Sequence, residues 1–215
     1  MPDSLSATNL QQSLAETFSA GLATLQIAFS EQQIEQSFAF LALLAKWNRV
    51  HNLTAITEPK EMLVKHLLDS LSVLHQLPAG TVLDVGSGAG IPGIPLAIAL
   101  PLQHFTLIDA SEKKSAFQRE AVRQLALDNV AVVNGRVEAY RGGPFSVVLA
   151  RAFSALDMFI DATRPLVGSD GYWLAMKGQL IDDELQALAL PEHRVHRLRV
   201  PGLNADRHLI IIPRT

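Results

Sequence analysis

The sequence predicts an α/β protein: a doubly wound, mostly parallel sheet with a C-terminal antiparallel hairpin and an N-terminal helical extension. From residue 81 onward, short apolar runs alternate with helical patterns, as in a parallel sheet covered by helices. A glycine-rich stretch follows the first of these runs and leads into a helix, which is typical of a strand–turn–helix unit. Before residue 80 the apolar side chains recur at helical spacing.

Length and composition set the broad class. The chain has 215 residues, which fits one α/β domain with an extension. It is 48% hydrophobic and 18% charged, the balance of a globular protein. Its net charge of −3 makes it no general polyanion binder, so any nucleic-acid contact must come from a local basic patch. There are no cysteines, which excludes disulfides, thiolate metal ligands and a cysteine nucleophile.

The ends and the apolar runs bear on localisation. No apolar run reaches the ~20 residues that span a bilayer, and the N-terminus lacks a basic region before an apolar core. We therefore expect a soluble, cytoplasmic protein without membrane association. Separately, we expect it to be a monomer. We also expect no bound metal.

The first 77 residues are predicted to be helical. Residues 10–29 show loose periodicity, and Ser30 with Gln33 forms a capping box for a helix that reaches about residue 47. Residues 47–54 are interpreted as a polar interruption. Thr57 is expected to cap the next helix, with Pro59 in its first turn. A proline and a glycine near residue 80 place the domain boundary close to residue 77, dividing the chain into 1–77 and 78–215.

Two polar residues of the second helix are three positions apart. His66 and Asp69 could meet on one helix face. The favoured interpretation is a satisfied pair on the helix surface.

Residues 81–100 carry the strongest signal. The run at 81–85 is predicted to be a buried strand, and Gly86, Gly88 and Gly90 follow at alternate positions. Pro92 and Pro95 then fit the first turn of a helix. Glycine permits positive φ and leaves the backbone open to a ligand. The helix start presents N–H groups that suit an anionic or polar ligand.

A second strand, predicted at 104–109, ends in an acid. Asp109 lies about one βαβ unit after the glycines, where a carboxylate can accept both hydroxyls of a ribose. An ordinary helix N-cap is the alternative, but the glycine turn beside it favours a cofactor site. A dinucleotide fingerprint would need glycine where Ile91 stands, which disfavours a nicotinamide enzyme. The D-x-G-x-G-x-G spacing is the one that S-adenosylmethionine-dependent methyltransferases use, so S-adenosyl-L-methionine is the expected cofactor.

The remaining elements continue the alternation. Residues 111–127 are predicted to form a helix with a basic outer face, and 155–164 a helix that stops at Pro165. Strands are predicted at 130–133, 145–150 and 172–177, with a turn at 168–171. The β-like segments 194–200 and 208–212 have a short link and suggest an antiparallel hairpin.

The carboxyl ends of these strands meet at one rim of the sheet. We expect the cofactor to lie across the glycine turn and Asp109, with Val137 and Glu138 beside its base. Arg151 follows the fourth strand and is the candidate catalytic residue, holding the cofactor or the acceptor instead of acting as a base. A surface ion pair is the alternative for Arg151.

Motifs that the sequence lacks restrict the type of atom that can accept the methyl group. The Asn/Asp-Pro-Pro-aromatic motif of methyltransferases that act on exocyclic amines is missing after the fourth strand, where the sequence reads ARAF. Without that motif or a cysteine, the acceptor should be an atom with its own free lone pair, such as N(7) of guanine. Such an atom can accept a methyl group without first losing a proton, so catalysis would rest on positioning, which can supply ~7–11 kcal/mol.

Several motifs in order carry a family resemblance. They are residues 52–54 (NLT), 66–70 (HLLDS), 84–96 (DVGSGAGIPGIPL), the strand end at Asp109, 136–138 (RVE), 150–152 (ARA), 177–178 (KG) and 207–209 (RHL). From about residue 47 to residue 212 the chain resembles the RsmG (GidB) family of bacterial 16S ribosomal RNA guanine-N(7) methyltransferases. The resemblance implies a Rossmann-like class I methyltransferase sheet. This chain keeps Asp109 but has Ala110 where the family usually has a hydroxyl residue.

The resemblance also implies activity and contacts. The activity is methyl transfer from S-adenosyl-L-methionine to one guanine in the decoding-region loop of 16S rRNA, within the small ribosomal subunit or an assembly intermediate. By position, the cofactor contacts would be Gly86, Ile91, Val137, Glu138 and Arg151. The candidate RNA-binding patch is basic and comprises Lys113, Lys114, Arg119, Arg123, Arg199 and Arg207.

Two other function classes remain open on the sequence. One is a small-molecule methyltransferase in which residues 1–77 form a lid. The other is a non-catalytic cofactor sensor or nucleotide-binding module.

Overall fold

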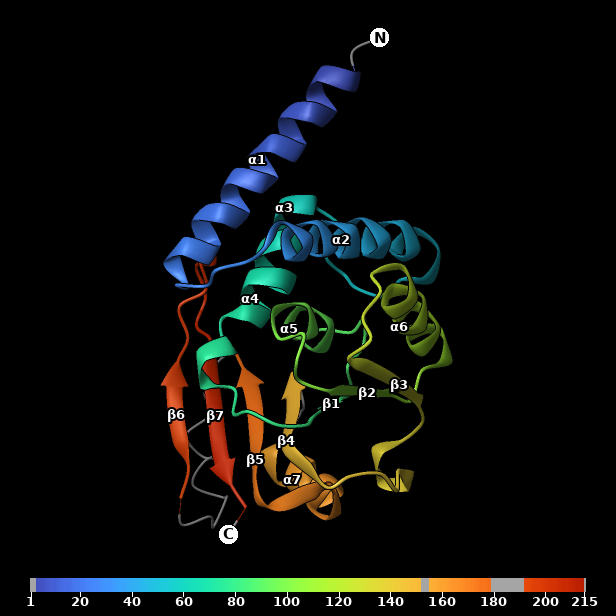
Figure 1. The fold of residues 1–215 in the computed structure, drawn as a ribbon, viewed down its shortest axis with the longest axis vertical. Helices are drawn as coiled ribbons and strands as arrows, with labels where there is room; N and C mark the ends of the chain where they lie inside the picture. Colours follow the sequence, from blue (N-terminus) through green and yellow to red (C-terminus); the bar gives the residue numbers. More distant parts are fainter. Residues whose placement is uncertain (1–2, 152–154, 179–191, 215) are drawn as a thin grey trace.

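The computed structural model describes residues 3–151, 155–178 and 192–214, and its centre is a seven-stranded sheet (Figure 1). The strand order is β3-β2-β1-β4-β5-β7-β6. The strands are β1 (Val82–Val85), β2 (Phe105–Asp109), β3 (Val130–Asn134), β4 (Phe145–Arg151), β5 (Val167–Lys177), β6 (Arg194–Arg197) and β7 (His208–Pro213). Strands β1 to β5 pair in parallel, whereas β7 is antiparallel to both β5 and β6. The predicted fold class and the C-terminal hairpin are confirmed.

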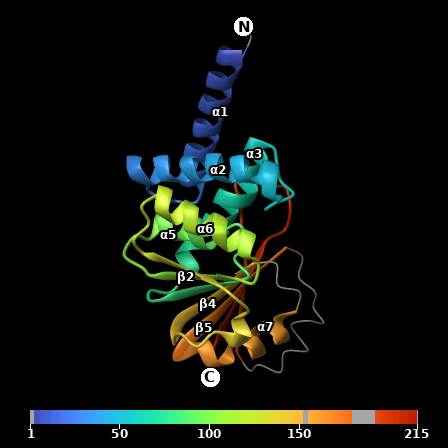
Figure 2. The ribbon, with the colours of Figure 1, turned by 90° about the vertical axis from the view of Figure 1, so that its right-hand side faces the viewer.

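Helices cover both faces of the sheet (Figure 2). Helices α5 (Gly93–Ala99) and α6 (Glu112–Gln124) lie on one face, and α7 (Leu156–Thr163) lies on the other. The face under α7 is sealed by a core that includes Phe159 and Trp173. This arrangement is the doubly wound one that the alternation of strands and helices predicts.

The N-terminal helices form a further layer outside α5 and α6. They are α1 (Asp3–Thr24), α2 (Glu31–His51), α3 (Pro59–Met62), a π-helix η1 (Leu63–Leu68) and α4 (Asp69–Leu71), followed by the 3-10 turn η2 (Leu74–Gln76). Figure 1 shows α1 outermost, with its N-terminal end far from the sheet. Phe40 of α2, Ile94 of α5 and Phe117 of α6 belong to one buried core, so that core continues across residue 77.

Two local predictions about these helices are wrong. Ser30 caps α2 through the predicted capping box, but the helix runs on to His51 and ends at Asn52, which is left-handed. Residues 47–51 stay helical because Trp47 packs on Phe117 and Asn48 is buried, with its side chain accepting the Thr54 N–H. The next helix is capped by Glu58 instead of Thr57, because the Glu58 carboxylate accepts the Glu61 N–H.

The predicted turn at 168–171 is also wrong. Strand β5 runs without interruption from Val167 to Lys177, and a register shift against β4 absorbs the extra residues. Phe145 pairs with Val167, whereas Val147 pairs with Tyr172. A β-bulge accommodates glycine within a strand, which is why the glycines there do not end it.

None of the helices in the described ranges combines the length and apolar character that a bilayer span requires.

Candidate active site

The glycine bend after β1 has the backbone conformation that its sequence predicts. The φ angles are +65° at Gly86, +59° at Gly88 and +72° at Gly90, a region that side chains with a Cβ adopt at a cost. A Cβ added at Gly86 would meet no atom within 4 Å, and one at Gly88 only a backbone oxygen at 3.9 Å. At Gly90 a Cβ would come within 2.4 Å of Ile94. The first two glycines therefore leave open space above the bend, and the third permits close packing against α5.

Asp109 connects the end of β2 to this bend. One carboxylate oxygen accepts the Gly88 N–H at 2.8 Å and the other accepts the Ser111 N–H at 2.8 Å. The Nζ of Lys114 lies 4.0 Å from the Gly88-bound oxygen. Ser111, not Asp109, is the N-cap residue of α6, so the ordinary N-cap alternative does not describe it. A carboxylate has about four acceptor positions, so Asp109 keeps capacity for ribose hydroxyls.

Gln118 holds the same bend from α6. Its amide donates to the Ser87 hydroxyl at 2.8 Å and to the Gly88 carbonyl at 2.7 Å. The residue is fully buried beside Phe117 and Ala121, on the face of α6 that is turned away from solvent. An amide on an apolar helix face is the sequence signal that would have singled it out.

Asp84 lies in β1 directly before the bend and was not among the predicted site residues. One of its carboxylate oxygens accepts the Gly93 N–H at 2.9 Å. The other is buried without a hydrogen-bond partner among the residues described. Burial raises the pKa of Asp84 to about 7, although the Gly93 N–H and the positive charge of Arg151 pull that pKa down. An acid inside an otherwise apolar strand was the available sequence signal.

These features fit a sulfonium nucleoside with an amino-acid tail. The space above Gly86 and Gly88 can admit a ligand, Asp109 offers acceptors for hydroxyls, and Asp84 offers an unpartnered acceptor for an N–H donor. The described residues contain no group of three or more acidic, histidine or cysteine side chains placed to hold a metal ion.

The other predicted cofactor contacts are placed as follows. The Ile91 side chain is buried in the core with α5 and α6, so only its backbone could face a ligand. Val137 is buried and Glu138 is exposed, both in the 3-10 turn η3 (Val137–Ala139) after β3. Residues 152–154, part of the sequence motif after the fourth strand, lie outside the described residues.

Arg151 ends β4 and belongs to a cluster built on Asp69. Its Nη1 donates to the Asp69 carboxylate at 3.1 Å and to the Lys65 carbonyl at 3.0 Å. The Nε of Arg207 donates to the other oxygen of that carboxylate at 2.9 Å. The Asp69 side chain is only 3% exposed, so the predicted surface pair of His66 and Asp69 is wrong: both residues are buried, and Asp69 pairs with two arginines.

His66 faces a different partner. Its Nε2 lies 3.1 Å from the Thr54 hydroxyl, and its Nδ1 is buried without a partner in the described chain. Burial, and then the positive charge of Arg151, lower the pKa of His66 to about 4. The residue therefore stays neutral in the fold. It sits in the π-helix η1, a widened helical form that is frequent at functional sites.

The six predicted RNA-binding residues fall into two groups. Lys113, Lys114, Arg119 and Arg123 lie on α6, near the β3 end of the sheet, whereas the other two lie beyond β6, near its opposite end (Figure 1). In the first group Lys113 donates to the His51 carbonyl at 2.9 Å, and Arg119 and Arg123 each pair with a glutamate of α6.

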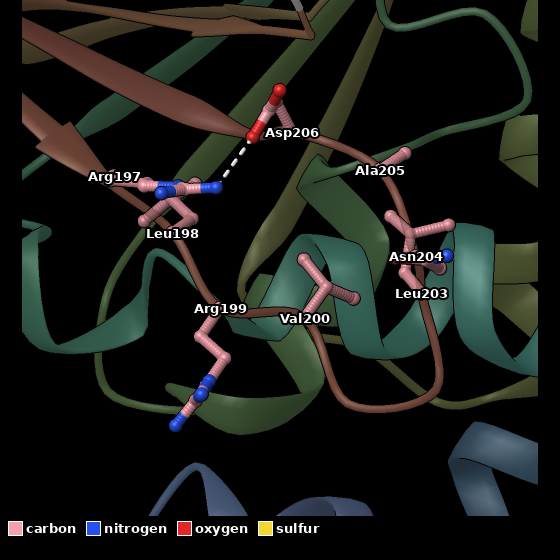
Figure 3. A pocket seen from close by; sticks show the side chains of 8 residues that line it. All are labelled: Arg197, Leu198, Arg199, Val200, Leu203, Asn204, Ala205 and Asp206. Carbon is pink, nitrogen blue, oxygen red and sulfur yellow. Dashed lines mark hydrogen bonds and ion pairs between the residues drawn. The ribbon is translucent and has the colours of Figure 1, made fainter.

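The second group belongs to the loop between β6 and β7. A cavity of about 660 Å³ lies in this loop, whose lining side chains Figure 3 shows. Arg197 pairs with Asp206 at 2.8 Å, whereas Arg199 extends away from that pair (Figure 3). Val200 and Leu203 pack against the core under the N-terminal helices, which fixes the loop beside η1.

The strand order, the open glycine bend and the acid at the end of β2 define an S-adenosylmethionine-dependent methyltransferase domain with a Rossmann-like sheet. Solved structures share this fold. A SAM-dependent methyltransferase from Aquifex aeolicus has a TM-score of 0.56 at 18% identity, over 80% of this chain and 98% of that one. M. jannaschii TYW2 in complex with AdoMet has a TM-score of 0.52 at 14% identity, over 67% of this chain and 73% of that one.

The chain belongs to the GidB family, rRNA small subunit methyltransferase G, whose sequence model matches residues 33–210. The ribosomal RNA small subunit methyltransferase G of Methylobacillus flagellatus is 49% identical over 201 residues, covering 93% of this chain and 98% of that protein. The protein of the same name from Ectopseudomonas mendocina is 48% identical over 212 residues, covering 96% and 99%. The predicted family is therefore confirmed.

Proposed function

We propose that this protein transfers the methyl group of S-adenosyl-L-methionine to N(7) of one guanine in the decoding-region loop of 16S rRNA. The observation that carries the proposal is the family match along residues 33–210, which includes the whole glycine bend and the Asp69 cluster. Relatives that share almost their full length with this chain bear the name of a small-subunit rRNA methyltransferase.

The cofactor would be held by the residues around the bend. Gly86, Gly88 and Gly90 shape the backbone beneath it, and Asp109 accepts from its ribose hydroxyls. Asp84 accepts from the amino group of its methionine portion through the oxygen that is unpartnered in the protein. Val137 and Glu138 flank the base. When bound, the cofactor supplies an electrophilic methyl group carried on a sulfonium.

The acceptor needs little acid–base help from the chain. N(7) of guanine carries a free lone pair, so no side chain has to remove a proton before the transfer. His66 is neutral and buried, and Arg151 is a permanent cation, so each suits orientation better than proton abstraction. The protein contributes by holding the two reactants in line, the effect that can supply ~7–11 kcal/mol.

The proposal also covers where the protein acts, its oligomeric state and its contacts with rRNA. The protein acts as a cytoplasmic monomer on the small ribosomal subunit or an assembly intermediate, with no membrane contact. The basic groups on α6 and on the β6–β7 loop contact rRNA. Because the chain carries a net charge of −3, these local groups must supply the attraction to phosphate.

The test compares rRNA from cells with and without the gene. We expect N(7) methylation of one guanine in the decoding-region loop to disappear on deletion and to return when the gene is restored. Restoring a variant with Gly86→Ala should return less of it. Unchanged rRNA in the deletion strain, with a methylated metabolite missing instead, would support the small-molecule alternative and contradict the proposal.

A further inference from the structure

A small pocket opens beside the proposed cofactor site at the same rim of the sheet. It has a volume of about 280 Å³, and its lining consists of Asp69, Arg151, Met176, Lys177, Gly178 and Arg207. Arg151 and Lys177 are the last residues of neighbouring parallel strands, and Arg207 comes directly before β7. Because Val85 pairs with Ala150, Gly86, the residue after β1, and Arg151, the last residue of β4, stand next to each other in register.

One buried carboxylate organises the pocket. Asp69 is 3% exposed and uses both oxygens, one for each arginine, while each arginine side chain is 26% exposed. Two guanidinium groups and one carboxylate leave an excess positive charge. A carboxylate taken out of water this completely is costly unless it is paired well on both sides.

Two hydrogen bonds fix the orientation of the Arg207 guanidinium. Its Nε donates to Asp69 at 2.9 Å and its Nη1 to the Asp206 carbonyl at 2.8 Å. Within the described part of the chain, Nη2 of Arg207 makes no hydrogen bond. A guanidinium fixed on one side with donors left on the other, in a net-positive pocket, matches the geometry that recognises a phosphate.

We propose that Asp69 is a positioning residue that fixes Arg207 beside Arg151 so that Arg207 binds a backbone phosphate of the RNA next to the target guanine. The inference rests on the proposed function for the identity of the RNA. It separates Arg207 from three basic residues of α6: Arg119 and Arg123 each pair with a glutamate of the same helix, and Lys113 donates to a carbonyl. Phosphate contacts set the register of a bound nucleic acid without reading its sequence.

The test measures the salt dependence of equilibrium binding to purified small subunits. Losing one phosphate contact lowers the slope of log Kd against log salt by about 0.7 to 0.9. We expect this decrease in Arg207→Gln and in Asp69→Asn. In Arg207→Gln the dissociation constant for S-adenosyl-L-methionine should change by less than about twofold. Asp206→Asn removes a carboxylate from the same loop but leaves its carbonyl in place, and should keep the wild-type slope.

The outcomes distinguish failure of the phosphate site from failure of the proposed function. A wild-type slope in Arg207→Gln overturns the phosphate site, and this variant of a partly exposed residue decides the matter if Asp69→Asn does not fold. A wild-type slope in a folded Asp69→Asn overturns the positioning role. Loss of cofactor affinity in Arg207→Gln would assign the pocket to the cofactor instead. Wild-type protein that binds subunits without methylating them contradicts the proposed function but leaves the slopes interpretable.

Discussion

Asp84 and His66 are buried titratable groups whose surroundings favour their neutral forms. Asp84 has a pKa of about 7, above its ordinary 3.8, so the folded protein holds this proton more tightly than the unfolded chain does. Stability from this group is present below pH 3.8 and is lost as the pH rises towards about 7. His66 has a pKa of about 4, below its ordinary 6.5, so its contribution is present above pH 6.5 and is lost as the pH falls towards about 4. The two contributions oppose each other.

Replacing either Asp84 or His66 should leave the pH dependence of stability that the other residue contributes. In Asp84→Asn the free energy of unfolding should rise from pH 4 to pH 6.5 relative to wild type, because the opposing loss is gone. The relative gain should be on the order of a few kcal/mol, since one pKa unit is worth about 1.4 kcal/mol. Urea unfolding at a series of pH values measures it, with His66→Gln expected to change the profile in the opposite direction. Parallel profiles for Asp84→Asn and wild type would contradict the assignment.

Gly86 should matter more for the cofactor than for the fold. In Gly86→Ala we expect a stability loss of only about 1–2 kcal/mol from the positive φ. Cofactor affinity should fall by about tenfold or more, on the order of 1.4 kcal/mol or above, because the methyl group enters the open space above the bend. Calorimetric titration and thermal unfolding measure the two effects. The control is Gly168→Ala, whose new Cβ would make only ordinary contacts at 3.4 Å or more. Equal affinity in both variants would mean that the ligand lies elsewhere.

At the residue level, the sequence predicted those site residues whose positions depend on local spacing along the chain. Gly86, Gly88, Gly90 and Asp109 stand at fixed distances along a strand–turn–helix unit, so the sequence itself carries that signal. The partners of Asp69 could not be predicted from the sequence, because they lie 82 and 138 residues away along the chain. Only the closing of the sheet brings these groups together.

Helix α6 presents a basic outer face whose charges are largely paired within the helix. Arg119 pairs with Glu112 at 2.6 Å, and Arg123 pairs with Glu120 at 2.8 Å. Exposed pairs of this kind contribute little to stability, so the arginines can exchange a glutamate for a phosphate at small cost.

The double variant Arg119→Ala with Arg123→Ala should therefore weaken rRNA methylation and spare the cofactor. We expect kcat/KM for small subunits to fall by about tenfold, on the order of 1.4 kcal/mol for two phosphate contacts. The dissociation constant for S-adenosyl-L-methionine should stay unchanged. Arg164→Ala, which removes a similarly paired arginine beyond the opposite face of the sheet, is the matched control. If the double variant and the control behave alike, the α6 face is merely solvated.

At the element level, the sequence predicted each strand of the sheet but not every boundary. The capping box at Ser30 is a local pattern and is confirmed. The end of α2 at His51 depends on the contact between Trp47 and Phe117, which are far apart in the chain. The continuity of β5 depends on its pairing with β4. Tertiary contacts decided both cases against local propensity.

For the whole molecule, the strand order places the site. The direction in which strands are added to the sheet reverses between β1 and β4. After β1 the chain adds β2 and β3 toward one edge, and it then returns to place β4 on the other side of β1. Ligands bind at such a switch point in open α/β sheets. The alternation of strands and helices predicted the fold class, but no local signal specified which strand lies beside which.

The proposed division at residue 77 can be examined through the shared core. Phe40 is fully buried, and its ring centroid lies 6.1 Å from that of Phe117. We expect Phe40→Ala to lower the free energy of unfolding by about 3–5 kcal/mol while the chain still unfolds in one transition, because α2 and the sheet share that core. Val50→Ala on the same helix, at a position 74% exposed, should change little. Two separate transitions would instead show that residues 1–77 and 78–215 fold independently.

The most direct measurement is transfer of a labelled methyl group by the purified protein to small subunits from cells that lack the gene. We expect label on N(7) of one guanine in the decoding-region loop of 16S rRNA. In Gly86→Ala the same guanine should be labelled only at higher concentrations of S-adenosyl-L-methionine. Absence of label, or label on another atom or on many guanines, would contradict the proposed activity.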